Sequence, residues 1–191
     1  MPVVVAATGS YLAGMRRFFL PALLALAALS LPMAEARAQQ RLGSFQSWTA
    51  ATHTEGGHKV CYAFARASKS EGVPNRKANN VLLVVTHRPQ GRDQVALQAG
   101  YTYPRTPDGA ADPVQVATGG PALGFFTAGN SAFARNGGAT VAAFRNGREA
   151  VARGPGPNGR GQASDTFSLS GFTAAYEAIS KACPAEGGAR R

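Results

Sequence analysis

Apolar residues alternate with polar ones in short stretches along most of the chain, which is the pattern of β-strands with one buried face. The alternation predicts strands at residues 45–52 and 59–66, joined as a hairpin by a turn that contains two glycines. Successive side chains of a strand point to opposite faces, so Tyr62 and Phe64 share one face and Cys61 lies on the other. Cys61 therefore need not point into the same layer as the aromatic residues, and a partner can approach it from outside the sheet.

A continuous apolar run at residues 80–88 is bounded by turn residues and predicts a central strand that is buried on both faces. Further alternating stretches predict strands at residues 93–103, 114–117, 123–127, 149–153 and 163–169. Segments rich in glycine, proline and polar residues are expected to form exposed loops at residues 67–79, 104–113 and 154–162.

Residues 131–147 are harder to interpret. Residues 131–135 could form a short strand, whereas Val141 and Phe144 lie three positions apart and Gly147 follows them. The spacing and the closing glycine favour a short helix near residues 138–147.

Helical spacing is clearest near the C-terminus, where apolar residues recur every three or four positions from Phe172 to Cys183. Ser170 is expected to cap the N-terminus of this helix, and Pro184 ends it, so a helix is predicted near residues 171–183. Many short strands and two helices predict a mainly β fold, an antiparallel β-sandwich or a barrel-like sheet pair.

The first 38 residues have the parts of a secretory signal peptide. Two arginines follow Met15, an apolar run covers residues 18–31, and small residues precede a cleavage site expected after Ala38. Met15 is the expected start of translation, because the residues before it fit no part of a signal. The apolar run is shorter than the ~20 residues that cross a membrane, so no transmembrane segment is expected after cleavage. Residues 39–191 are then expected to form one exported domain.

The chain is basic, with 20 lysine and arginine residues, 10 aspartate and glutamate residues, and a formal net charge of +10. Three of these arginines and one glutamate precede Gln39, so the exported part keeps a charge of about +8. The basic residues are spread along the chain, unlike a nucleic-acid-binding tail. The expected partner is an unknown envelope protein or an anionic envelope component such as lipopolysaccharide, acidic lipid or cell-wall polymer. The alternative is a basic surface that is merely solvated.

Only two cysteines are present, Cys61 and Cys183, and both lie in the part expected to be exported. An even pair in an oxidising compartment predicts one disulfide bond. Neither cysteine has a second cysteine or a histidine at zinc-ligand spacing, so a metal or redox site is the weaker interpretation.

The strongest enzyme hypothesis is a hydrolase that uses Asp165, His87 and a serine such as Ser164 or Ser168. No Gly-x-Ser-x-Gly motif accompanies them. His87, at the end of a buried strand, is expected to be structural, so no catalytic residue is assigned.

No metal or cofactor site is expected either. His53 and His58 flank a turn but lack a third ligand. The glycine-rich segment at residues 154–162 has neither the lysine of a phosphate-binding loop nor a following helix.

Aromatic and basic residues near one another suggest a recognition surface for an anionic glycan or a partner. Core packing explains Trp48 and Tyr101 at least as well. Tyr103 and Arg105, at the end of a predicted strand, are the better candidates for surface contacts.

Several segments resemble the invasion-associated locus B family over nearly the whole exported part. The matching pieces follow in order along the chain: Lys59-Val60-Cys61-Tyr62-Ala63, Thr86-His87-Arg88-Pro89, Gly100-Tyr101, the stretch from Asp165 to Ala175, and Ala182-Cys183. One departure is Gly129-Asn130-Ser131-Ala132-Phe133, which has phenylalanine in place of the tryptophan of the family.

The resemblance implies a protein exported by alphaproteobacteria to the periplasm, with association with the outer membrane or secretion as alternatives, and with no known enzymatic activity. One pathogenic member is linked to entry into host cells. The expected function is thus a non-catalytic binding or supporting role in the envelope. The alternatives are a periplasmic hydrolase or glycan-processing enzyme, and a secreted factor that meets host surfaces. The sequence leaves the ligand and the oligomeric state open.

Overall fold

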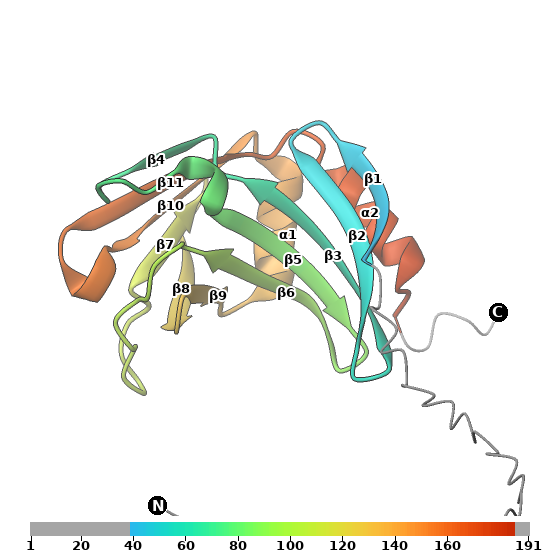
Figure 1. Ribbon diagram of the computed structural model, residues 1–191, viewed down its shortest axis with the longest axis horizontal. Helices are drawn as coiled ribbons and strands as arrows, with labels where there is room; N and C mark the ends of the chain where they lie inside the picture. The colour runs from blue at the N-terminus through green and yellow to red at the C-terminus, as the bar shows by residue number, and fades with distance from the viewer. Residues whose placement is uncertain (1–38, 186–191) are drawn as a thin grey trace, which may run out of the picture. The chain divides into compact units, whose positions relative to one another are not determined.

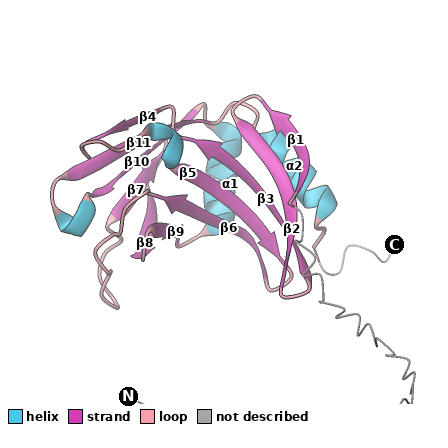
Figure 2. Cartoon of the chain, in the orientation of Figure 1, coloured by secondary structure: helices cyan, strands magenta, loops and turns pink. Residues whose placement is uncertain are grey.

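The computed structural model describes residues 39–185, which form a mainly β domain with two α-helices (Figures 1 and 2). The strands are β1 (Gln40–Phe45), β2 (Trp48–Glu55), β3 (His58–Arg66), β4 (Lys69–Glu71), β5 (Leu82–Arg88), β6 (Gly91–Gln98), β7 (Val114–Ala117), β8 (Leu123–Ala128), β9 (Ser131–Ala134), β10 (Glu149–Pro155) and β11 (Gln162–Ser168). The helices are α1 (Gly137–Asn146) and α2 (Phe172–Ala182), with short 3₁₀ turns η1 (Ala78–Asn80) and η2 (Pro157–Gly159). The predicted signal peptide, its cleavage site and the start at Met15 lie outside the described residues.

All eleven strands belong to one antiparallel sheet with the order β1-β2-β3-β5-β6-β9-β8-β7-β10-β11-β4. The predicted hairpin at residues 45–66 is confirmed as β2 and β3, in which Thr52 lies opposite Cys61. The sheet is so strongly curved that its far end returns to β3, where the main-chain N–H of Ser68 donates to the carbonyl of Thr166 in β11. The predicted sandwich-like antiparallel fold is confirmed, and its two layers are parts of one continuous sheet.

Both helices lie on the inner face of the sheet, where α2 packs on β1, β2 and β3, and α1 packs on β6 (Figure 1). The Trp48 and Phe172 rings meet edge to face with centroids 4.8 Å apart, and Phe144 of α1 lies 5.5 Å from Phe172. The indole N–H of Trp48 donates to the carbonyl of Ser168, so burying this large side chain leaves its polar group satisfied. No helix among the described residues is long and apolar enough to cross a membrane.

Both predicted helices are confirmed, but the N-terminal cap of α2 differs from the prediction. The side chain of Asn136 caps α1 by accepting a hydrogen bond from the N–H of Ala139. α2 begins after Gly171 and not after Ser170, and no side chain caps it. Gly171 has φ +88°, and a Cβ there would lie 2.0 Å from the carbonyl oxygen of Phe45, so only glycine fits this turn.

Two edge strands were not predicted, and one predicted strand is too long. No element was predicted before residue 45, where β1 lies, and β4 falls in a predicted exposed loop. Neither strand has an alternating apolar pattern, and each forms by pairing with an inner strand, β2 or β11. The strand predicted at residues 93–103 ends at Gln98, because Gly100 turns the chain with φ +75°.

The alternation predicted for β3 is confirmed, but the layer that each of its faces meets and the burial of β5 differ from the prediction. In β3, Cys61 and its neighbours at every second position face the helices, whereas Tyr62 and Phe64 are half-exposed on the opposite, outer face. Residues 80–88 were expected to be buried on both faces, but β5 buries only Leu83, Val85 and His87. The outer face of this part of the sheet therefore carries apolar side chains that no other described element covers.

Candidate functional site

The outer faces of β3 and β5 form the floor of a hollow of about 460 Å³, here called the outer-face groove. Its floor consists of four apolar or aromatic side chains, namely Tyr62, Phe64, Leu82 and Val84. Its rim consists of polar and basic side chains, namely Gln39, His53, Arg66, Thr86, Arg88 and Gln98. The solvent-exposed face of a sheet is expected to be polar. An exposed apolar floor surrounded by polar side chains is instead typical of a ligand-binding or protein-binding surface.

The apolar floor continues across the sheet beyond the groove. Registered cross-strand pairs place one row of half-exposed side chains on the outer face, running through Phe64, Val84, Ala96, Phe133 and Phe126. Side chains that are paired in this way pack against one another. Their mutual contacts leave them half-buried, which stabilises the exposed row without covering it.

The aromatic side chains of the groove are ordered by contacts among themselves. Tyr62 and Phe64 have nearly parallel rings, 23° apart with centroids at 6.2 Å, and His53 meets Tyr62 edge to face at 5.4 Å. Gln39 donates a hydrogen bond to the Tyr62 hydroxyl. Burial raises the pKa of Tyr62, so its hydroxyl stays protonated and can still donate a hydrogen bond.

Positive charge stands at both ends of the groove. Arg66 lies opposite Leu82 at one end of β5, and Arg88 is at the other end, six residues on or about 20 Å along an extended strand. Arg88 forms an ion pair with Glu55 at 3.1 Å and donates to the Gln94 amide oxygen at 2.7 Å, and Arg66 donates to the Asn79 carbonyl. A guanidinium has five N–H donors, so both can still bind an anion. None of the residues that line the groove is acidic.

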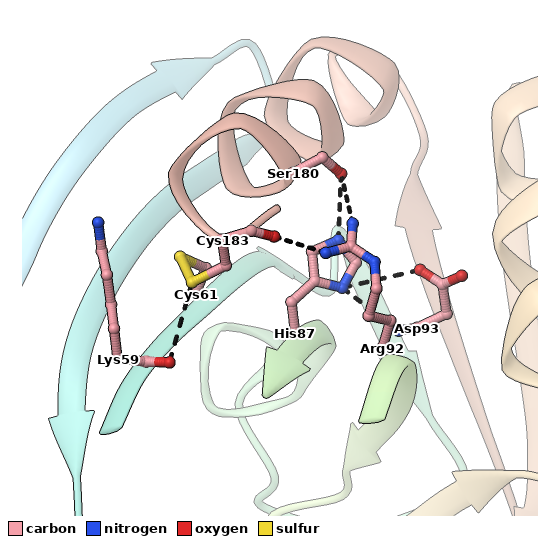
Figure 3. Close-up of a disulfide and its surroundings, with 7 residues drawn as sticks. All are labelled: Lys59, Cys61, His87, Arg92, Asp93, Ser180 and Cys183. Carbon is pink, nitrogen blue, oxygen red and sulfur yellow. Dashed lines mark hydrogen bonds and ion pairs between the residues drawn. A yellow bond between two sulfur atoms is a disulfide. The ribbon is translucent and has the colours of Figure 1, made fainter. Parts of the chain in front are cut away.

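A second group of polar side chains lies on the inner side, beside the disulfide (Figure 3). The imidazole of His87 is 1% exposed; its Nε2 lies 3.1 Å from Ser180 Oγ, and its Nδ1 lies 3.7 Å from a carboxylate oxygen of Asp93. A serine, a histidine and an aspartate therefore lie in the order of a hydrolase triad. Neither this serine nor this aspartate was proposed for such a site from the sequence.

The hydrogen bonds of His87 are reversed from those that catalysis needs. The main-chain N–H of Asp93 donates to Nδ1 at 3.3 Å, so Nδ1 carries no proton and the proton of the neutral ring is on Nε2. Nε2 therefore donates to Ser180 Oγ, whereas a general base must accept the proton of the serine. Arg92 also donates to Ser180 Oγ at 3.2 Å, which makes this hydroxyl a double acceptor. The arrangement ties α2 to β5 and β6.

Burial, followed by the nearby Arg92 guanidinium, lowers the pKa of His87 to about 4. In the unfolded chain the pKa of histidine is about 6.5, so as the pH falls the unfolded chain takes up this proton first. The neutral His87 side chain therefore contributes fully to the free energy of unfolding above pH ~6.5, and we expect this contribution to be lost progressively as the pH falls toward ~4. Urea unfolding across this range should show a steeper loss in the wild type than in His87→Gln. Parallel curves for the two proteins would contradict this interpretation.

Asp165 takes part in a different interaction, so the structure does not assemble the hydrolase site proposed from the sequence. Its carboxylate accepts two hydrogen bonds from Arg76, at 2.7 and 2.9 Å, and the two side chains are 2% and 5% exposed. Arg76 also donates to the carbonyl of Ala99 and lies over the ring of Tyr101. This ion pair joins the segment before η1 and the segment after β6 to β11. Nothing in the sequence pattern singled out Arg76.

The predicted disulfide between Cys61 and Cys183 is confirmed, with Cα atoms 6.0 Å apart. It links β3 to the last turn of α2 from the inner face, not from outside the sheet as expected. A pocket of about 250 Å³ lies beside it, lined in part by Lys59 and Arg92. Arg92 donates to the carbonyl of Cys183 at 2.5 Å, so its charge serves to cap the C-terminus of α2.

Of the two surface contacts predicted from the sequence, the structure corrects one. Tyr103 is only 6% exposed and belongs to the core, where its ring meets that of Tyr101 at 5.0 Å. Burial raises the pKa of its phenol. Tyr103 lies an even number of positions from Val95 and Leu97, the buried residues of β6, and it too faces inward. Its main-chain N–H donates to the carbonyl of Gly129. Arg105 is exposed, as expected of a surface residue.

The two histidines that flank the first hairpin turn do not form a metal site. His53 lies opposite Val60, and His58 lies opposite Glu55, so they are not cross-strand partners. His53 Nε2 is 3.8 Å from Glu55 instead. Residues 39–185 contain no cluster of three or more His, Cys, Asp or Glu side chains that could hold a metal ion.

Fold and site together define a small antiparallel β domain, closed by one disulfide, with an uncovered amphipathic groove on its outer face. The chain belongs to the invasion associated locus B (IalB) protein family, whose pattern matches residues 48–180. Among solved structures it is similar to invasion associated protein B from Bartonella henselae, with 18% sequence identity, a TM-score of 0.47, and coverage of 73% of this chain and 95% of that chain. No curated protein matches the chain.

Proposed function

We propose that this protein is an exported, non-catalytic binding protein of the bacterial envelope, and that it binds an anionic envelope component through the outer-face groove. The observation that carries the proposal is the groove itself: an apolar floor that no other described element covers, with an arginine at each end and no acidic side chain among the described residues of its lining. Glu55, which pairs with Arg88, lies outside that lining. An exposed apolar surface lowers the solubility of a domain, so its presence here is best explained by a binding partner that covers it.

The charge of the whole protein supports an anionic partner. The charge of about +8 on residues 39–191 attracts anions over distances longer than any single contact, and the two groove arginines give that attraction a docking point. The inner pocket beside the disulfide is the weaker candidate, because Arg92 is bound to the C-terminus of α2. The carbonyl groups there also disfavour an anion.

Two observations support a non-catalytic role. The Ser180–His87–Asp93 group holds its histidine in the tautomer that donates to serine, and Asp165 is occupied by Arg76. Export to the periplasm is supported by the signal-like first 38 residues and by the disulfide, which is stable in an oxidising compartment. Association with the outer membrane, or secretion and contact with host surfaces, would follow from where the bound component lies.

We expect the double variant Arg66→Gln/Arg88→Gln to bind isolated Gram-negative envelope fractions about tenfold more weakly than the wild type, a change of about 1.4 kcal/mol. The wild-type binding should also weaken as salt is raised, since partly exposed charges are screened. Co-sedimentation of the purified protein with these fractions measures both effects.

The matched control is Arg153→Gln/Arg160→Gln, which removes the same charge from exposed residues outside the groove. This control should bind within about twofold of the wild type, or 0.4 kcal/mol. Equal losses in the two double variants would show that only net charge matters, and the proposed site would be wrong.

A further inference from the structure

We infer that the anionic component held in the outer-face groove is an acidic oligosaccharide, a chain of sugar rings that carries carboxylate, phosphate or sulfate groups. This inference rests on the proposed function and names the ligand class for the same site. It follows from three features of the groove: its aromatic floor, its hydrogen-bonding rim and the spacing of its arginines.

The floor suits sugar rings better than it suits a wholly polar ligand. Tyr62 and Phe64 form a continuous aromatic surface, with ring centroids 6.2 Å apart and planes 23° apart. Sugar rings have apolar C–H faces that pack on aromatic rings, while their hydroxyl groups point sideways. Val84 and Leu82 extend this floor along β5, which gives several rings in a row a place to pack.

The rim offers the sideways contacts that hydroxyl groups need. Gln39 and Gln98 are amides that both donate and accept hydrogen bonds, and the His53 imidazole and Thr86 hydroxyl belong to the same lining. Such side chains can satisfy several neutral hydroxyl groups at once. A purely hydrocarbon ligand would leave these polar groups without partners.

The two arginines favour an anionic ligand, and they disfavour a second copy of this protein in the groove. Arg66 and Arg88 stand about 20 Å apart, so a chain with acidic groups along its length can meet both at once. A second copy of the exported protein would bring the same arginines and a further charge of about +8 to the interface. A flat lipid surface fits a protruding face better than this hollow one.

The test uses fluorescently labelled oligosaccharides of matched length with the purified full-length protein. Three are acidic, namely oligogalacturonate, a phosphorylated oligomannoside and a heparin oligosaccharide, and one, an oligogalactoside, is neutral. We expect at least one acidic sugar to raise the fluorescence anisotropy at concentrations at least tenfold lower than the neutral one requires.

Two phenylalanines of the same outer-face row provide a matched pair of variants. Phe64 lies in the groove and Phe126 lies outside it, and both are half-exposed. Phe64→Ser should weaken binding of the acidic sugar by about fivefold, whereas Phe126→Ser should change it by less than about twofold. Melting temperatures of both variants show whether the fold is intact, and Arg66→Gln/Arg88→Gln provides a second test that leaves the aromatic floor unchanged.

The alternative outcomes separate the two proposals. If none of the acidic sugars binds more tightly than the neutral one, or if Phe64→Ser and Phe126→Ser bind them equally, the oligosaccharide inference is wrong. If phosphatidylglycerol vesicles or a polyglutamate peptide bind through Arg66 and Arg88 while the sugars do not, the proposed function stands with another ligand. If envelope fractions also fail to bind through these arginines, both proposals are wrong.

Discussion

Replacing Asp165 by alanine is expected to lower the free energy of unfolding by about 3–5 kcal/mol. The carboxylate accepts two hydrogen bonds from Arg76, and both side chains are almost fully buried. Removing it leaves a guanidinium charge in the core with no counter-ion, which costs more than the pair itself contributes. Chemical denaturation of the purified variant measures the loss.

The control is a double variant that replaces both partners by apolar residues, Arg76→Met/Asp165→Leu. Since no unpaired charge remains, this protein should be less destabilised than either single variant. A loss below about 1 kcal/mol in Asp165→Ala would mean that the pair is solvated and does not hold β11 to the segments around Arg76 and Ala99. Additive losses in the double variant would also contradict this account.

Removing the disulfide by Cys61→Ala/Cys183→Ala is expected to lower the free energy of unfolding by about 4–5 kcal/mol. The bond closes a loop with a sequence separation of 122 residues, so it removes many conformations from the unfolded chain. In the folded state it fixes the C-terminus of α2 on β3, next to the contacts of Arg92 and Ser180. Urea unfolding of the oxidised and variant proteins measures the difference.

Reduction of the wild-type protein provides the control for this prediction. The reduced protein and the double variant should have similar unfolding midpoints, because both lack the cross-link and keep small side chains at both positions. A reduced protein as stable as the oxidised one would show that the long loop is already constrained in the unfolded chain.

The sequence predicted most of the strands and both helices because their apolar residues follow the periods that burial on one face imposes. It missed β1 and β4 because edge strands have little to bury; Gln40–Phe45 is held by hydrogen bonds to β2 and by α2, which are contacts from elsewhere in the chain. Local pattern also could not show that β6 ends at Gln98, before the turn at Gly100.

The orientation of β3 could have been predicted by combining two correct predictions. If Cys61 pairs with Cys183, and Cys183 is on a helix that must bury its apolar face, then Cys61 faces the layer that the helix covers. Alternation then places Tyr62 and Phe64 on the other, uncovered face. The groove was therefore implied by the disulfide and the strand period together. The Arg76–Asp165 pair had no comparable signal, because it joins residues 89 positions apart.

The recognition surface predicted from the sequence and the outer-face groove of the structure lie at different places. A recognition surface for an anionic glycan or partner was sought at Tyr103 and Arg105, and Tyr103 proved to be buried. Partly exposed aromatic and basic residues lie together instead on β3 and β5. They come together only because the sheet registers Phe64 with Val84 and Arg66 with Leu82.

Methyl NMR shows directly whether the protein binds its proposed envelope component in the outer-face groove. Leu82 and Val84 have methyl groups in the groove floor, and Val151, half-exposed on β10, provides a control outside it. On titration with a soluble acidic fraction of the envelope, we expect the Leu82 and Val84 methyl signals to shift while those of Val151 stay in place. Shifts at Val151 without shifts at Leu82 and Val84, or none at any of the three, would contradict it.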